Sequence, residues 1–242
     1  MNSLHLKISH LSELALVVMQ SVLAKNDTSS LFEKDDQGPL ALASALSDFF
    51  QIADVIEQNI DELESDEISE FGDYALGMLD RLGYFTRQLE VMDQNPNLGC
   101  VYASLAYWLV QRGAVLNNLA GVADGFARMV NGLQNASELA EMCGPMEAII
   151  SSASESIQAD EDKSNTWRPW RIINLNAGIA ATRSLDPQLM EATFARLSQR
   201  LPQEMSGFFS DGSRQMIGQE VPDEVRTVMN RYRDQWTDVT TH

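Results

Sequence analysis

Apolar residues recur along this chain at spacings that add up to seven, so they form long rows. One such row in the first segment is Leu4, Leu11 and Val18, and similar rows run through residues 42–63 and 68–92. A seven-residue repeat places an apolar stripe on one side of a helix and favours neighbours that cross at about 20°. A strand would alternate every second residue, and no segment does so convincingly. The pattern therefore predicts an all-α protein.

The fourth segment keeps the same rhythm over a longer distance, from Leu98 to Cys143. This continuity favours one very long helix. However, Asn131-Gly132 is typical of a helix end, and Asn135 followed by Glu138 is typical of a capping box at a helix start. We therefore predict a break near residues 131–135.

Prolines divide the remainder of the chain, because proline fits the first turn of a helix and disrupts its interior. We expect each of the seven prolines to mark a helix start, with shorter helices at 146–157, 170–185, 187–201, 203–209 and 222–238 and a loop over 207–218. The predicted fold is an all-α multi-helix bundle of eight or nine helices. Long antiparallel N-terminal helices would be followed by shorter C-terminal ones.

The formal net charge of −18 is unusual, and it is distributed unevenly. Residues 1–96 carry 18 acids and 5 bases, whereas residues 165–242 carry nine of each, and all nine bases are Arg. A polar stretch at residues 158–166 separates the two regions. The sequence thus predicts an acidic long-helix bundle over residues 1–158 and an Arg-bearing part with shorter helices over residues 165–242. One continuous domain with uneven charge is the alternative.

This charge also bears on partners and location. A strongly acidic chain repels nucleic acid phosphates and anionic lipids, and it is attracted to basic protein surfaces. We expect no direct nucleic acid or membrane partner, and no apolar run of membrane-spanning length. Cys100 and Cys143 are too few for a disulfide framework and fall on apolar positions, so a reducing cytoplasm is the expected compartment. Homo-oligomers remain open.

Candidate catalytic and metal sites are weak. Asp54, Glu57, Asp61 and Glu64 lie on one flank of a helix, but no Glu-x-x-His motif accompanies them, so a solvated acidic face is the simpler interpretation. Residues 160–171 start like a calcium loop and end with Arg171 where a bidentate Glu is needed. No nucleophile elbow or phosphate loop occurs. The sequence indicates no cofactor or metal and favours a protein that is not an enzyme.

A single charge, Arg112, interrupts an otherwise apolar row of the fourth segment. It could contact an anionic ligand or an acidic partner inside a helical groove. Alternatively, its methylene groups lie along the core while the guanidinium reaches the edge and pairs with an acid. The structural alternative is the simpler one.

The most distinctive string is Trp167-Arg168-Pro169-Trp170-Arg171. Trp and Arg are enriched in interaction hot spots, and Arg can stack on indole rings. The other interpretation is an internal latch, in which the indoles fill a gap and the arginines pair with the acidic helices. We favour the latch for Trp170 and leave Trp167 open as a partner contact.

Three functions remain open. The leading prediction is a non-enzymatic interaction or adaptor protein with an unidentified protein partner. The first alternative is a helical protein or enzyme that holds a small ligand in an internal pocket, with Arg112 or Arg171 as the anion contact. The second is an acidic mimic that sequesters a nucleic-acid-binding protein. An exposed apolar groove would favour the first function, and a polar pocket the ligand-binding one.

Overall fold

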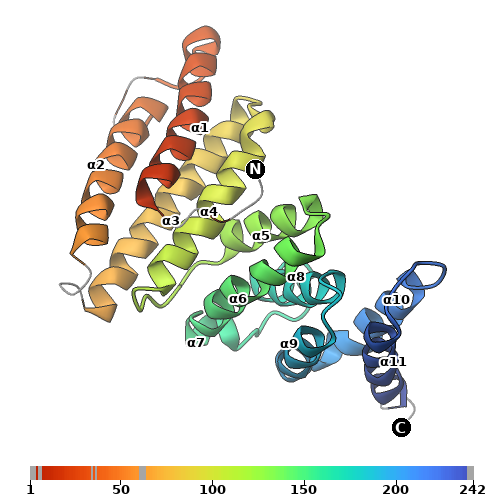
Figure 1. Ribbon diagram of the computed structural model, residues 1–242. Helices are drawn as coiled ribbons and strands as arrows, with labels where there is room; N and C mark the ends of the chain where they lie inside the picture. Colours follow the sequence, from red (N-terminus) through yellow and green to blue (C-terminus); the bar gives the residue numbers. More distant parts are fainter. Residues whose placement is uncertain (1–3, 5–6, 34, 36, 60–63, 239–242) are drawn as a thin grey trace.

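The computed structural model describes the chain except for residues 1–3, 5–6, 34, 36, 60–63 and 239–242 (Figure 1). Over the described residues the chain forms eleven α-helices and two short 3₁₀ helices. No strand forms there; Leu116 and Ala153 make an isolated bridge. The predicted all-α class is confirmed, and the predicted count of eight or nine helices is wrong.

The first four helices lie side by side at one end of the molecule (Figure 1). They are α1 (Ile8–Ser29), α2 (Pro39–Gln58), α3 (Ser65–Gln88) and α4 (Asn95–Val110). Helix α1 packs against α2 and α4, and α3 packs against the same two neighbours. The predicted stripes supply their core: Phe49, Leu82, Phe85 and Leu105 are buried, and Ile56 and Phe71 are half-buried. Helix α2 lies at the outer edge of the molecule (Figure 1).

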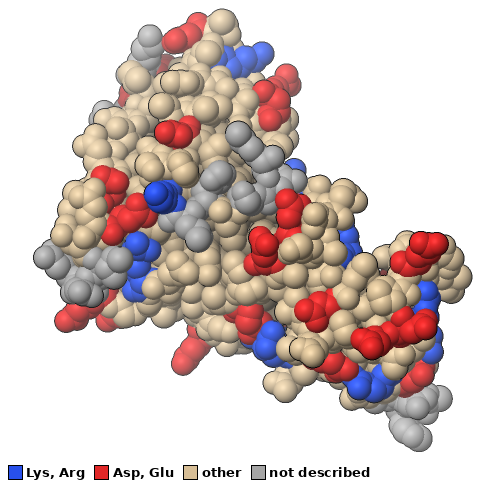
Figure 2. Space-filling view, viewed as in Figure 1, with Lys and Arg blue, Asp and Glu red and all other residues tan. Residues whose placement is uncertain are grey.

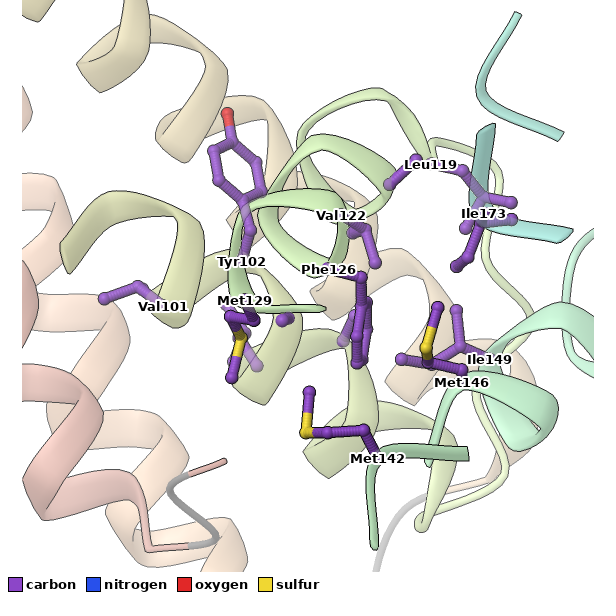
Figure 3. Close-up of a cluster of buried hydrophobic side chains, with 14 of the residues drawn as sticks. Val101, Tyr102, Leu119, Val122, Phe126, Met129, Met142, Met146, Ile149 and Ile173 are labelled. Carbon is purple, nitrogen blue, oxygen red and sulfur yellow. The ribbon is translucent and has the colours of Figure 1, made fainter. Parts of the chain in front are cut away.

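Helix α4 connects this bundle to a second group of helices. These are α5 (Ala120–Gly132), α6 (Ala136–Ser151), the short α7 (Glu155–Gln158) and α8 (Pro169–Arg183). Helix α5 packs along α4, and α8 packs against both α5 and α6. Phe126, Met146, Ile149 and Ile173 meet in the space between them (Figure 3). Buried residues from Ile8 to Met229 belong to one hydrophobic cluster.

The last helices are α9 (Pro187–Arg200), α10 (Met205–Gln215) and α11 (Asp223–Asp238). Helices α10 and α11 pack against each other, and α11 also packs against α9. The α10–α11 pair projects from the end of the molecule opposite α2 (Figure 1). Two 3₁₀ helices, Met92–Gln94 and Pro202–Glu204, precede α4 and α10.

The fourth segment is broken twice. The break near residues 131–135 is confirmed: Asn135 caps α6 by accepting from the backbone N–H groups of Ser137 and Glu138. The expected continuity from Leu98 up to that point is wrong, because α4 ends at Val110 and Gly113 adopts a φ of 87°. Glycine tolerates this left-handed conformation without steric strain.

Two further expectations from proline and glycine fail because tertiary packing overrides local propensity. Pro145 lies inside α6 rather than at a helix start. The neighbouring turns bury Met142, Met146 and Ile149 in the core, which offsets the hydrogen bond that proline cannot donate. The loop expected over 207–218 is helical up to Gln215, since Phe209 packs edge-on against Phe194.

The acidic stretch before and within α3 is largely exposed. Asp61 and Glu62 lie outside the described residues, whereas four acids face solvent: Glu64, Asp66, Glu67 and Glu70. Glu64 and Glu67 form a reciprocal capping box at the start of α3. Carboxylates are favourable here because they accept from the free N–H groups of the first turn and complement the helix dipole.

Candidate functional site

The two tryptophans of the Trp-Arg string have opposite environments. Trp170, in the first turn of α8, is 5% exposed and belongs to the core cluster. Trp167 precedes the helix and is 81% exposed. Trp170 is therefore inaccessible to a partner unless the structure opens, whereas the face of Trp167 is free to contact one.

Arg168 is buried and bonded on several sides. Its Nε donates to Asp160 Oδ1 at 2.6 Å, its Nη1 donates to the Asn165 carbonyl at 3.0 Å, and its Nη2 lies 3.3 Å from Glu204 Oε1. Burial would lower the pKa of Arg168, but the bonds to Asp160 and Glu204 raise it above its ordinary value. This is the geometry that a latch requires. One of its acids, Asp160, comes from residues 1–164 as a latch predicts, although from the linker rather than from a long helix, and the other, Glu204, comes from the C-terminal part.

Arg171 pairs with the same carboxylate, donating from Nη2 to Glu204 Oε2 at 2.8 Å. It also lines a groove of about 310 Å³ between α8 and α10, together with Leu175, Ile179 and Phe208. Its charge is already neutralised by Glu204, so an incoming anion would have to compete with an existing ion pair. Arg171 is thus a poor anion contact for a small ligand.

Arg112 lies just beyond the end of α4, and not within an apolar stripe. Its guanidinium carbon stacks 3.9 Å from the centre of the Trp108 ring, and its Nη1 donates to the Trp108 carbonyl at 3.0 Å. Burial lowers the pKa of Arg112, and the nearby negative charge of Glu57 acts against that change. Glu57 also accepts from Trp108 Nε1 at 3.1 Å, so Arg112 takes part in fixing α2 to α4.

A surface that the sequence did not single out is formed by the outer sides of α2 and α3. Four large apolar side chains are more than half exposed there: Leu40, Ile52 and Val55 on α2 and Tyr74 on α3. Ala41, Ala45, Ile52 and Val55 fall on one side of α2 because they follow each other by four, seven and three residues. We define the α2–α3 surface as seven residues: Leu40, Ala41, Ala45, Ile52 and Val55 on α2, and Tyr74 and Gly77 on α3. Residues of this kind at an edge helix are typical of an interaction site.

The α2–α3 surface is hollowed beside the first turns of α2. A groove of about 450 Å³ lies between the two helices, with Ala41, Ala45 and Gly77 among its lining residues and Leu42 and Met78 beneath. No atom lies within 4 Å of the position that a Cβ on Gly77 would take. Small residues therefore leave room for a ridge of side chains from another helix.

Acids lie near one end of this groove. Asp73 lines it, and Asp48 and Glu70, three residues from the lining residues Ala45 and Asp73, are exposed. Arg81 supplies the positive charge in the lining and donates to the Gln37 carbonyl at 2.7 Å. Figure 2 shows that the surface over α1 and α2 on the visible side is mostly uncharged, with scattered acidic and basic groups. An apolar groove with a negative rim favours an apolar ligand that carries positive charge at its edges.

Helix α2 is both long and apolar. Among the described helices, it is long and apolar enough to cross a membrane by length and composition, although only a third of its apolar window is buried. The sequence predicted no apolar run of membrane-spanning length, and by length and mean hydropathy this helix does not meet that expectation. The signal was visible in the sequence: Leu40, Ile52 and Val55 lie outside the buried rows of α2, so the helix has more apolar residues than one stripe needs.

Within the part of the chain that the structure describes, no three His, Cys, Asp or Glu side chains gather in a group that could hold a metal ion. Of the acidic flank considered from the sequence, Asp54 and Glu64 are exposed and Glu57 is bonded to Trp108. Asp61 lies outside the described residues.

Comparisons with protein-family models, curated proteins and solved structures gave no match to this chain.

Proposed function

We propose that this protein is a non-enzymatic interaction protein, and that its α2–α3 surface binds an amphipathic helix with Lys or Arg along its edges from another protein. The observation that carries the proposal is the combination of an apolar edge groove with an acidic rim. The groove would receive the apolar face of the helix, as in other helix-in-groove complexes. The rim would attract its basic flanks.

The charge of this region selects among possible occupants. A second copy of the same chain would bring Asp48, Glu70 and Asp73 against an identical set of acids, which costs energy. An anionic membrane surface would be repelled for the same reason. A basic helix has no such conflict, and the negative field around residues 1–96 would increase its rate of association. The cysteines support the cytoplasm as the location. Cys100 and Cys143 are free buried thiols, and a reducing compartment keeps thiols in this state.

Tyr74 is the best candidate for a central contact. It is 61% exposed, stands beside the groove and belongs to a residue type enriched in hot spots. We expect Tyr74→Ala to weaken binding by about 2 kcal/mol, roughly thirtyfold, without changing the melting temperature. The affinity should also fall as salt is raised, because the rim charges are exposed and therefore screened.

Photo-crosslinking in the native host tests this proposal. A photoreactive phenylalanine derivative placed at position 74 should form an adduct with a peptide whose apolar residues follow helical spacing and whose flanks carry Lys or Arg. The same probe at Ile217, which is 75% exposed but remote from the groove, should not capture that peptide. Ile52→Lys should abolish the adduct by repelling the basic flanks, whereas Ile217→Lys should leave it intact.

Several results would contradict the proposal. These are an adduct between two copies of this chain, an adduct with an acidic segment, an adduct with lipid, and no protein adduct at position 74. Equal adduct yields from Ile52→Lys and Ile217→Lys would also contradict it.

A further inference from the structure

Another cavity, of about 380 Å³, lies between α3, α4 and α5, on a different side of α3 from the groove beside Tyr74. Its size lies at the lower end of the range typical of small-molecule sites. Three glycines, Gly83, Gly99 and Gly121, are among its lining residues, so backbone rather than side chains forms part of its wall. Leu98 and Met92 provide apolar contacts.

One side of this cavity holds a carboxylate that is fixed in place but not neutralised. Asp80 Oδ1 accepts from the Tyr102 hydroxyl at 2.6 Å, and Oδ2 accepts from Asn118 Nδ2 at 2.7 Å. Both donors are uncharged, and Asp80 forms no ion pair with any described residue. Tyr102 turns its hydroxyl away from the apolar cluster around Phe126 (Figure 3).

The Tyr102 hydroxyl is a permanent donor. Burial and the hydrogen bond to Asp80 together raise the pKa of Tyr102 far above its ordinary value. The phenol therefore stays protonated at neutral pH. Asp80 consequently keeps one fixed orientation, with its negative charge available to a ligand.

A cation lies close to this carboxylate. Arg87 follows Asp80 by two helical turns, and its side chain forms no ion pair or hydrogen bond within the described part of the chain. Its Nη1 lies 3.5 Å from the position that a Cβ on Gly83 would occupy, and the Tyr102 hydroxyl lies 3.9 Å from the same point. Arg87 and the Asp80–Tyr102 pair thus border the same space above Gly83.

We propose that this cavity binds a small zwitterion of the amino-acid type, with its ammonium group on Asp80 and its carboxylate on Arg87. A simple anion would be repelled by Asp80, and a simple cation by Arg87. A zwitterion satisfies both groups, and its charge-assisted hydrogen bonds are the strong kind. Asp124 and Arg128, which pair with each other at 2.9 Å, add one further charge of each sign among the lining residues.

Thermal shift and calorimetric titration of the full chain with the common amino acids test the proposal. At millimolar concentration at least one of them should raise the melting temperature, because a ligand that binds the folded state stabilises it. The N-acetyl derivative of that amino acid lacks the ammonium charge. The C-terminal amide of the same amino acid keeps the ammonium group but lacks the carboxylate. Each should bind at least about tenfold more weakly than the parent, since each loses one charged hydrogen bond.

Three variants locate the site. Asp80→Asn and Arg87→Gln should each weaken binding at least about tenfold. Gly83→Ala should weaken it by filling the space directly, and the fold should tolerate this change because the added methyl would meet its neighbours no closer than 3.5 Å. Arg81→Gln, on the same helix but in the groove beside Tyr74, should bind like the wild type.

The proposal is overturned if no free amino acid shifts the melting temperature at millimolar concentration. It is also overturned if the blocked derivatives bind as tightly as the parent, or if Asp80→Asn and Arg87→Gln retain wild-type affinity. Because Tyr74 and Ile52 lie outside this cavity, variants there separate a failure of this site from a failure of the proposed protein interaction.

Discussion

Arg168 Nε lies 2.6 Å from Asp160 Oδ1, and the two side chains are only 7% and 6% exposed. This bond joins the linker after α7 to the start of α8. Asp160 adopts a φ of 47°, a left-handed conformation that Asp and Asn tolerate better than most residues. The pair therefore fixes the path of the chain between two helices, and it does so away from water, where an unpaired charge is costly.

Asp160→Asn should destabilise the protein, because it keeps the backbone conformation but removes the charge that faces buried Arg168. We expect a loss of about 2 kcal/mol in the free energy of unfolding, typical of a hydrogen bond to a charged group. Urea unfolding followed by circular dichroism measures it. Asp162→Asn is the matched control, since Asp162 is exposed in the same linker and should change stability by less than about 0.5 kcal/mol. Equal stabilities for the two variants would contradict the role of this bond.

The two tryptophans of the string should differ sharply when truncated. Trp170→Ala removes a buried indole from the core and should cost about 3–5 kcal/mol, whereas Trp167→Ala should leave the melting temperature within a degree or two. Trp170→Phe should cost much less than Trp170→Ala, because Trp170 Nε1 is buried without a hydrogen-bond partner and phenylalanine removes that unsatisfied donor. Thermal melts of the three variants decide the matter. A shift of less than a degree or two for Trp170→Ala would contradict the latch.

Glycines at the contact between α4 and α5 allow the backbones to approach closely. A Cβ on Gly125 would lie 2.4 Å from the Gly99 carbonyl oxygen, a distance that requires one of the helices to move. Gly125→Ala should therefore destabilise the protein by about 1–3 kcal/mol, as overpacking does. Gly207→Ala, inside α10 with no atom within 4 Å of the added methyl, should instead stabilise it by up to about 1 kcal/mol. Chemical denaturation measures the free energy of unfolding of both variants. If Gly125→Ala and Gly207→Ala change it with the same sign, this explanation is refuted.

The turn between α4 and α5 could not be predicted from the sequence pattern. The apolar rows of α4 and α5 share one phase across residues 111–119, so periodicity alone indicates a single helix. The turn is fixed by contacts that are distant in sequence: Ser65 donates to the Gly113 carbonyl, and the Val115 N–H donates to Ser69. Such pairings are not visible in a local pattern.

Local signals were reliable where the chemistry is local. The cap by Asn135 occurs as expected, and Asp186 caps α9 before Pro187 in the same way, because each side chain accepts from N–H groups only two or three residues away. The partner of Arg168 could not be predicted, since 35 acids offer no basis for choosing Asp160 and Glu204. The exposed apolar side of α2 does not follow from the heptad pattern, because that pattern identifies one buried stripe and does not indicate which other positions face a partner.

Glu204 should make stability depend on pH in a way that one substitution can isolate. The hydrogen bond from Arg171 is the main reason that the pKa of Glu204 lies below its ordinary value of 4.5, with Arg168 contributing in the same direction and burial opposing them. A depressed pKa in the folded state means that the unfolded state takes up a proton first as the pH falls. The stabilisation is therefore complete above the ordinary pKa and is lost as the pH falls through the lower, folded value.

Glu204→Gln removes this contribution. The wild type should be more stable than the variant by on the order of 1 kcal/mol at neutral pH, a modest value because the carboxylate is 21% exposed. The difference should stay constant down to about pH 5 and then shrink, because a protonated glutamic acid and a glutamine at this position are both uncharged. Urea unfolding across this range measures it, with Glu161→Gln, an exposed residue of the linker, as the control that should show no such convergence. If the curves of wild type and Glu204→Gln instead run parallel at every pH, the carboxylate of Glu204 does not hold Arg168 and Arg171 in place by its charge.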